Sequence, residues 1–146
     1  MTSIIIFHSE SFTEEVIKPL QATLMEILNK EDCCVVSAAG DTDDNVFYLL
    51  HKLQKWYPSS LFNFHPSSLN IVSKLVAENK FDEYGMDLIA FDFQLACKKK
   101  CTAQRLRDKT LLKNADIIIY RESNDLKQND FKKRFLIKPT AVFIDL

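Results

Sequence analysis

The stretch ADIIIY, residues 115–120, decides the fold. Its three isoleucines and a tyrosine are typical of a strand that is buried on both faces, because no polar residue alternates with them. The segment before it, 102–114, is rich in charge and has helical spacing. A helix that runs directly into a buried strand is the repeating unit of α/β proteins. The stretch therefore predicts an inner strand of a parallel sheet.

Further strand-like and helical segments alternate along the chain on either side of this stretch. Apolar runs at 3–7, 33–38, 61–65 and 141–146 predict strands, and amphipathic segments lie between them. Segment 87–93 fits either a strand or the start of a helix. We expect a single domain, residues 1–146, with a three-layer α/β/α Rossmann-like fold and a mostly parallel sheet of five to six strands.

The first helical segment carries two local signals. Ser11 and Glu14 have the spacing of a capping box, which predicts that the helix begins after Ser11. Pro19 lies inside the same pattern, so we expect it either to kink the helix or to mark a new start.

The composition limits the kinds of binding partner and the cellular compartment that we expect. A formal charge of −1 argues against nucleic acid as a partner. No apolar run reaches the roughly 18–20 residues of a membrane span, so we expect no membrane contact. Four cysteines without a secretion signal predict reduced thiols and a cytoplasmic location.

Glycine is scarce, and this limits the kinds of phosphate site. Only Gly40 and Gly85 occur in the chain. Phosphate-cradling loops need glycine where the backbone approaches the ligand or takes a positive φ. No P-loop or dinucleotide fingerprint is present, and we predict no cofactor.

Parallel α/β sheets bind ligands beyond the carboxyl ends of their strands, which makes FHSES, residues 7–11, the first candidate site. Ser9 and Ser11 are placed to donate to an anion at the start of the following helix, and His8 adds a titratable group. Glu10 is a candidate base or nucleophile. The structural alternative is that Ser11 only caps the helix and His8 is an ordinary edge histidine.

SAAGDTDDN, residues 37–45, follows the second predicted strand and is the second candidate site. Gly40 permits close backbone approach, and Asp41 and Asp43 are placed to accept hydrogen bonds from ribose hydroxyls. Asp43 is also the second candidate for catalysis. The alternative is a solvated acidic turn in which Asp43 or Asp44 caps the next helix.

Cys101 and Arg107 have the C-x5-R spacing of cysteine phosphatases, but the residues around them do not fit that site. The segment between them contains no glycine and reads as one continuous helix, on which residues six apart point to different sides. We therefore rank cysteine catalysis below the other hypotheses. Cys97 and Cys101 have no second pair with zinc-type spacing, so no metal is predicted.

RDKTLLKNADIIIY, residues 107–120, resembles a segment of YspA-like proteins, which belong to the Rossmann-like nucleotide-sensing superfamily that also contains lysine-decarboxylase-like proteins. Arg107 matches the arginine of that segment, and Ala115 and Asp116 keep its register. Asp108 stands where asparagine is usual. The resemblance implies the fold and a nucleotide-like ligand, with Arg107 binding phosphate. Nucleoside deoxyribosyltransferase-like proteins carry a related pattern and remain an alternative.

The chain departs from that family at two places, and the departures leave two functional hypotheses. FHSES stands where the family has a glycine-rich turn, and RESNDLKQND, residues 121–130, replaces an expected Gly-Thr pair. The first hypothesis is a protein that binds a nucleotide or nucleotide-derived ligand; if it is an enzyme, the expected chemistry is N-glycosidic or phosphoester cleavage. The second is a non-catalytic interaction module that keeps the fold and binds a protein partner or a second copy of itself.

Overall fold

A computed structural model describes residues 1–8, 10–66, 68–84, 88–89, 100–123 and 126–146. Its strands form one five-stranded parallel sheet in the order β3-β2-β1-β4-β5. The predicted parallel α/β fold is thereby confirmed. The strands are β1 (Thr2–His8), β2 (Cys33–Ala39), β3 (Leu61–Phe64), β4 (Ile117–Tyr120) and β5 (Val142–Asp145).

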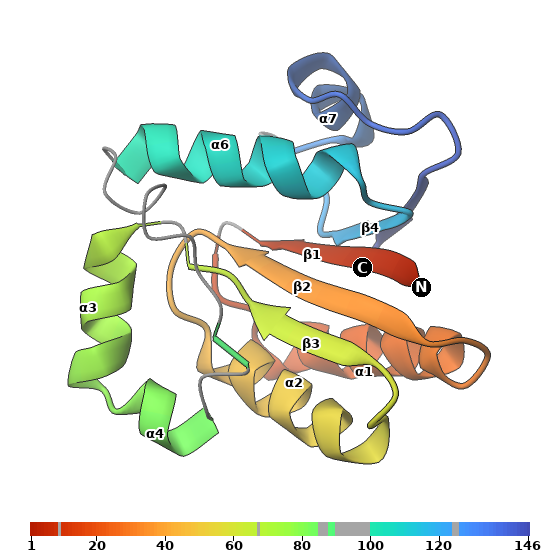
Figure 1. Ribbon diagram of the computed structural model, residues 1–146. Coiled ribbons are helices and arrows are strands. Elements are labelled where there is room, and N and C mark those ends of the chain that lie inside the picture. Colours follow the sequence, from red (N-terminus) through yellow and green to blue (C-terminus); the bar gives the residue numbers. More distant parts are fainter. Residues whose placement is uncertain (9, 67, 85–87, 90–99, 124–125) are drawn as a thin grey trace.

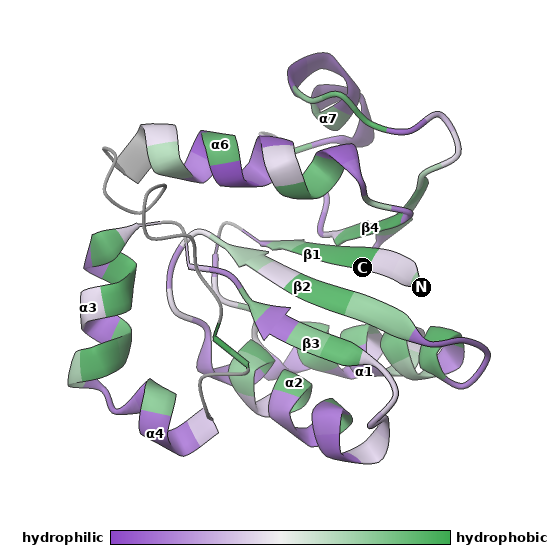
Figure 2. Ribbon diagram, in the orientation of Figure 1, coloured by the Kyte–Doolittle hydropathy of each residue, from purple (hydrophilic) through white to green (hydrophobic). Residues whose placement is uncertain are grey.

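Helices cover both faces of the sheet and make the three layers (Figure 1). On one face lie α1 (Glu14–Leu28) and α2 (Asp44–Trp56), while α6 (Lys100–Lys113) and α7 (Gln128–Arg134) lie on the other. The short helices α3 (Leu69–Ala77) and α4 (Lys80–Tyr84) follow β3. Figure 2 shows hydrophobic strands between helices that carry polar residues along much of their length.

The side-chain alternation of the strands divides the core into two clusters. Ile4 and Ile6 of β1 pack with buried residues of α1 and α2. Ile5, between them, belongs to the opposite cluster with Ile118 of β4 and Leu112 of α6. Successive strand residues point to opposite faces, so a sheet covered on both sides needs apolar residues at every position. The unbroken isoleucine run of β1 meets that need.

The first helix begins later than the capping box predicts. Its first residue is Glu14 and its N-cap is Thr13, whereas the Ser11 hydroxyl donates to the carbonyl of Thr42 at 3.1 Å. The reason is Phe12, which is buried and whose amide donates to Asp43 at 2.8 Å. This tertiary bond holds the chain outside the helix until Thr13. The helix then runs through Pro19 to Leu28, so Pro19 does not start a new helix.

Two other segments compare the structure with what the local sequence pattern predicts. Helix α7 runs from Gln128 to Arg134, although the described residues 135–138 continue the mixture of apolar and basic side chains. Ile89 pairs in parallel with Phe64, and the Phe64 amide donates to the Leu88 carbonyl, so this short piece lies beside the edge strand β3. Residues 87 and 90–93 of the ambiguous segment lie outside the described residues.

The predicted helix before β4 forms, but charged residues share its buried face. Leu106 and Leu111 are half-buried, whereas Leu112 is fully buried. Arg107 is fully enclosed and Asp108 is 4% exposed. An adjacent pair of opposite charges therefore occupies a position that hydrophobic patterning reserves for apolar residues.

None of the helices in the described part of the chain is long and apolar enough to cross a membrane.

Candidate functional site

The sheet order places a crevice between β1 and β4. The chain leaves β1 toward β2 and β3 on one side and returns to β4 on the other, so the direction of winding reverses between these two neighbours. In open α/β sheets, ligands bind in the crevice outside the carboxyl ends of the strands at such a reversal. The carboxyl ends here are His8 of β1 and Tyr120 of β4.

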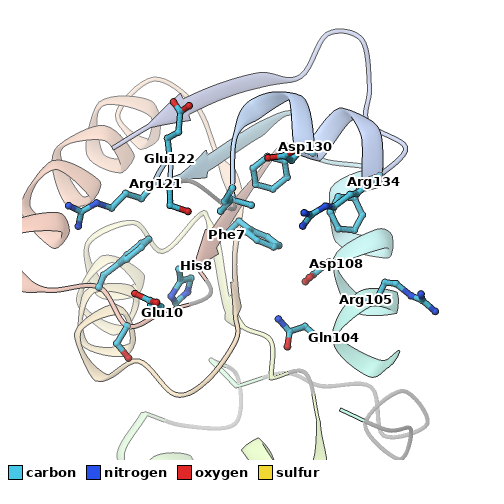
Figure 3. Close-up of a pocket in the computed structure, with 16 residues that line it drawn as sticks. Phe7, His8, Glu10, Gln104, Arg105, Asp108, Arg121, Glu122, Asp130 and Arg134 are labelled. Carbon is cyan, nitrogen blue, oxygen red and sulfur yellow. The ribbon is translucent and has the colours of Figure 1, made fainter. Parts of the chain in front are cut away.

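A cavity of about 1030 Å³ occupies this crevice. Ligand sites in proteins commonly have volumes of about 300–1,000 Å³, so the space is ample for a mononucleotide. The end of β1 and the loop after it, α6, the loop after β4 and α7 enclose it (Figure 3). Its lining comprises Phe7, His8, Glu10, Ser11, Phe12, Gln104, Arg105, Asp108, Arg121, Glu122, Ser123, Leu126, Asp130, Phe131, Arg134 and Phe135.

Aromatic side chains make the inner wall of the cavity. Phe7 meets Phe131 of α7 edge to face, with ring centroids 5.1 Å apart. Phe131 also contacts Phe135 and Tyr120, so the wall continues into the core under β4. Phe7 and Phe135 are half-buried and keep part of their surface toward the cavity. Such a surface suits the flat face of a planar ring.

Charged groups of both signs surround this wall. Arg105, Arg121 and Arg134 line the cavity, and no hydrogen bond or ion pair joins their guanidinium groups to other residues that the structure describes. Figure 3 shows Arg134 beside Asp130 and Phe7, whereas the guanidinium of Arg105 extends outward. Of the three cations, Arg134 is therefore best placed to meet an anion inside the cavity.

The start of α1 does not favour an anion. Glu14 and Glu15 occupy its first turn, and Glu10 lies just before it. A helix N-terminus attracts negative charge through its free N–H groups and its dipole, but carboxylates in the first turn already supply that charge. An anionic group of a ligand has a better partner in Arg134, in the last turn of α7.

His8 lies at the cavity with both ring nitrogens engaged. Nδ1 is 3.1 Å from Asp43 Oδ2, and Nε2 is 2.5 Å from the Ser37 hydroxyl. Because an ionised carboxylate only accepts, Nδ1 donates to Asp43, and in the neutral ring Nε2 accepts from Ser37. The Ser37 side chain is fully buried, so this Ser-His-Asp arrangement has no accessible nucleophile. His8 presents its ring to the cavity.

Asp43 is fully engaged in holding the structure together. Its Oδ1 accepts from the Val46 amide at 3.2 Å, which makes it the N-cap of α2. Its Oδ2 accepts from His8 and from the Phe12 amide. Asp43 thus ties the loop after β1 to the start of α2, and neither oxygen is left for chemistry on a ligand.

The predicted residues come together at the carboxyl edge, although only some reach the cavity. The Gly40 amide donates to the His8 carbonyl at 2.9 Å, and Arg107 Nη1 donates to the Ala39 carbonyl at 2.5 Å. His8, Gly40 and Arg107 therefore lie at the same edge of the sheet. Among the described residues predicted as site residues, His8, Glu10 and Ser11 line the cavity, and Gly40, Asp41, Asp43 and Arg107 do not. Ser9 lies outside the described residues.

The Arg107 guanidinium donates its hydrogen bonds to protein atoms and does not line the cavity. Its guanidinium donates to the carbonyls of Ala39 and His65 at the ends of β2 and β3. Nε and Nη2 donate to Asp108 Oδ1 at 2.9 and 2.7 Å. Four of the five N–H groups of the guanidinium are therefore used. Bidentate binding of a phosphate by Arg107 would require some of these hydrogen bonds to break.

Asp108 is one of the lining residues that the sequence did not predict. Burial raises the pKa of its carboxyl group, and the charge and hydrogen bonds of Arg107 act in the opposite direction. A buried carboxyl in a cavity is a common feature of functional sites. The one signal in the sequence is that Asp108 follows Arg107 in a helix that leads to the sheet.

The cavity's α7 wall was also missed. Leu126, Phe131 and Arg134 lie in a segment whose charge is typical of a solvated helix. No group of three or more His, Cys, Asp or Glu side chains with the arrangement of a metal site occurs among the residues that the structure describes.

Comparison with protein-family models, with curated proteins and with solved structures finds no significant match.

Proposed function

We propose that the protein binds a nucleotide or nucleotide-derived ligand in the cavity between β1 and β4. The observation that carries this proposal is the position of a roughly 1030 Å³ cavity at the reversal of strand order. The chemistry of its lining supports the same ligand class. Phe7 and Phe135 offer a surface for a base, and Arg134 offers a cation for a phosphate. The resemblance of residues 107–120 to nucleotide-sensing proteins is consistent with this ligand.

Cleavage of the ligand is a second step of the proposal. Glu10 is an exposed carboxylate at the cavity and is our candidate for the base or nucleophile in N-glycosidic or phosphoester cleavage. Asp43 is no longer a candidate, because its oxygens cap α2 and hold His8 and Phe12.

A non-catalytic interaction module remains the competing proposal, and one surface favours it. Tyr48 and Trp56 of α2 are 63% and 52% exposed, and Lys52 lies over both rings. Exposed aromatic side chains of this kind are enriched at protein interfaces. This surface lies on the opposite side of the sheet from α6 and α7, so the two proposals can be tested by separate variants.

A thermal-shift screen against nucleoside mono-, di- and triphosphates tests the proposed function. A ligand that binds only the native state raises stability by RT ln(1 + [L]/Kd), so a binder at 100 times its Kd adds about 2.7 kcal/mol. We expect at least one nucleotide to raise the Tm, and we expect Arg134→Gln to weaken that effect about tenfold in apparent Kd.

Lys133→Gln is the matched control, because it removes the same charge from the neighbouring exposed position outside the cavity lining. It should bind as the wild type does. No Tm shift with any nucleotide at millimolar concentration, or equal binding by the Arg134 and Lys133 variants, would contradict the proposal.

A further inference from the structure

The carboxylate of Asp108 has one fixed oxygen and one open oxygen. Oδ1 receives both bonds from Arg107, at 2.9 and 2.7 Å. For Oδ2, no hydrogen bond is found within the described ranges of the chain. The side chain is only 6% exposed, yet it lines the cavity. Because this oxygen still has surface open to the cavity, a donor on a ligand can replace water there.

The bonds from Arg107 to Oδ1 hold the Asp108 carboxylate in place, and so they also fix the position of Oδ2. The guanidinium is itself anchored to the carbonyls of Ala39 and His65. Asp108 is thus held through Arg107 to the ends of two strands, and its free oxygen has a fixed direction. Binding groups that are held in place before the ligand arrives lose little entropy on binding.

Gln104 supplies a second polar group on the same side of the cavity. It precedes Asp108 by one helical turn on α6, so both side chains lie on one face of that helix. Gln104 also lines the cavity, and its carboxamide has no hydrogen-bond partner among the residues described. In Figure 3 the two side chains lie across the cavity from His8 and Glu10, and Asp108 lies near Phe7 and Arg134.

We propose that Asp108 Oδ2 and Gln104 bind the hydroxyl groups of the ligand's sugar, which makes the site selective for ribose over deoxyribose. An ionised carboxylate accepts hydrogen bonds and repels phosphate, so its partner must be a donor such as a hydroxyl group. In a nucleotide the sugar joins the base to the phosphate, and Figure 3 shows Asp108 close to both Phe7 and Arg134. This inference rests on the proposed function and assigns the sugar of the ligand to side chains of α6.

Isothermal titration calorimetry with AMP, 2′-deoxy-AMP, 2′,3′-dideoxy-AMP and ribose 5-phosphate tests the assignment. We expect the wild type to bind AMP about tenfold or more tightly than the dideoxy analogue, because each lost hydroxyl leaves a buried acceptor unpaired. Ribose 5-phosphate should compete with AMP, since the sugar and phosphate contacts do not need the base.

Two variants separate this role from a structural one. Asp108→Asn keeps an oxygen for Arg107 but replaces the open acceptor, and Gln104→Met removes the carboxamide at similar length. In each, the preference for AMP over the dideoxy analogue should fall at least about threefold, whereas Lys109→Met on the exposed side of α6 should keep it. Folding of each variant is checked by its Tm and circular dichroism.

The outcomes distinguish the two proposals. Equal affinity of the wild type for AMP and the dideoxy analogue would overturn the sugar assignment and leave nucleotide binding intact. An unchanged preference in both the Asp108 and Gln104 variants would do the same. Failure of all four compounds to bind at millimolar concentration would overturn the assignment together with the proposed function.

Discussion

Arg107 and Asp108 show how a single pair of charged residues can join the layers of this protein. The guanidinium binds the carbonyls at the ends of β2 and β3, and the carboxylate closes its other side. A buried arginine whose hydrogen bonds are made in this way stabilises the fold and holds one conformation. The resemblance to nucleotide-sensing proteins implied a phosphate contact for Arg107, and the geometry instead supports a positioning role through Asp108.

Replacement of Arg107 should therefore affect stability before it affects binding. In Arg107→Ala, Asp108 stays buried without its partner and two strand-end carbonyls lose their donor, so we expect a loss of about 3–5 kcal/mol in the free energy of unfolding. Urea denaturation measures this loss. Arg105→Ala, at an exposed position two residues earlier, is the stability control and should change the midpoint little. Similar midpoints for the two variants would show that the pair does not hold the layers together.

At the scale of secondary-structure elements, Asp116 fastens β4 to β1 and to the segment before β5. Its carboxylate accepts from the Ser3 amide at 2.9 Å and from Lys138 at 3.0 Å. The hydrogen bond from Ser3, followed by that from Lys138, holds the pKa of Asp116 below its usual value. The side chain is 38% exposed, so solvent screening keeps the contribution below about 1 kcal/mol.

This contact has a defined pH dependence. Because the pKa of Asp116 is lower in the folded state, its contribution is complete above the unfolded carboxyl pKa of about 3.9 and is lost as the pH falls through the folded value. We expect Asp116→Asn to lower the Tm at pH 7, and the difference from the wild type to shrink toward pH 3. Asp82→Asn, on an exposed turn of α4, is the control. A difference that grows on acidification would contradict this assignment.

The elements themselves could largely be predicted from the sequence, because their signals are local. Unbroken β-branched runs such as Ile4–Ile6 and Ile117–Ile119 identify strands that are covered on both faces. The start of α1 could not be predicted in this way, since it depends on a bond between Phe12 and Asp43, 31 residues apart. The buried face of α6 was missed because hydrophobic patterning treats Arg107 and Asp108 as exposed.

At the scale of the whole molecule, the site depends on strand order, which no local pattern contains. The sequence places polar residues after β1 and β2, and these do meet at one edge of the sheet. The order β3-β2-β1-β4-β5, however, opens the crevice on the β4 side of β1. The cavity therefore takes six of its sixteen lining residues from α6 and α7, and Gly40, Asp41 and Asp43 do not line it.

The most direct test of the account locates a bound nucleotide on the molecule. In a titration of ¹⁵N-labelled protein with AMP, followed by amide chemical shifts, we expect the largest changes at Phe7, His8, Gln104, Asp108 and Arg134, with little change on α2. Shifts centred on Tyr48 and Trp56 of α2, or no shifts at millimolar AMP and the other nucleotides of the screen, would contradict the central claim that the crevice between β1 and β4 is the ligand site.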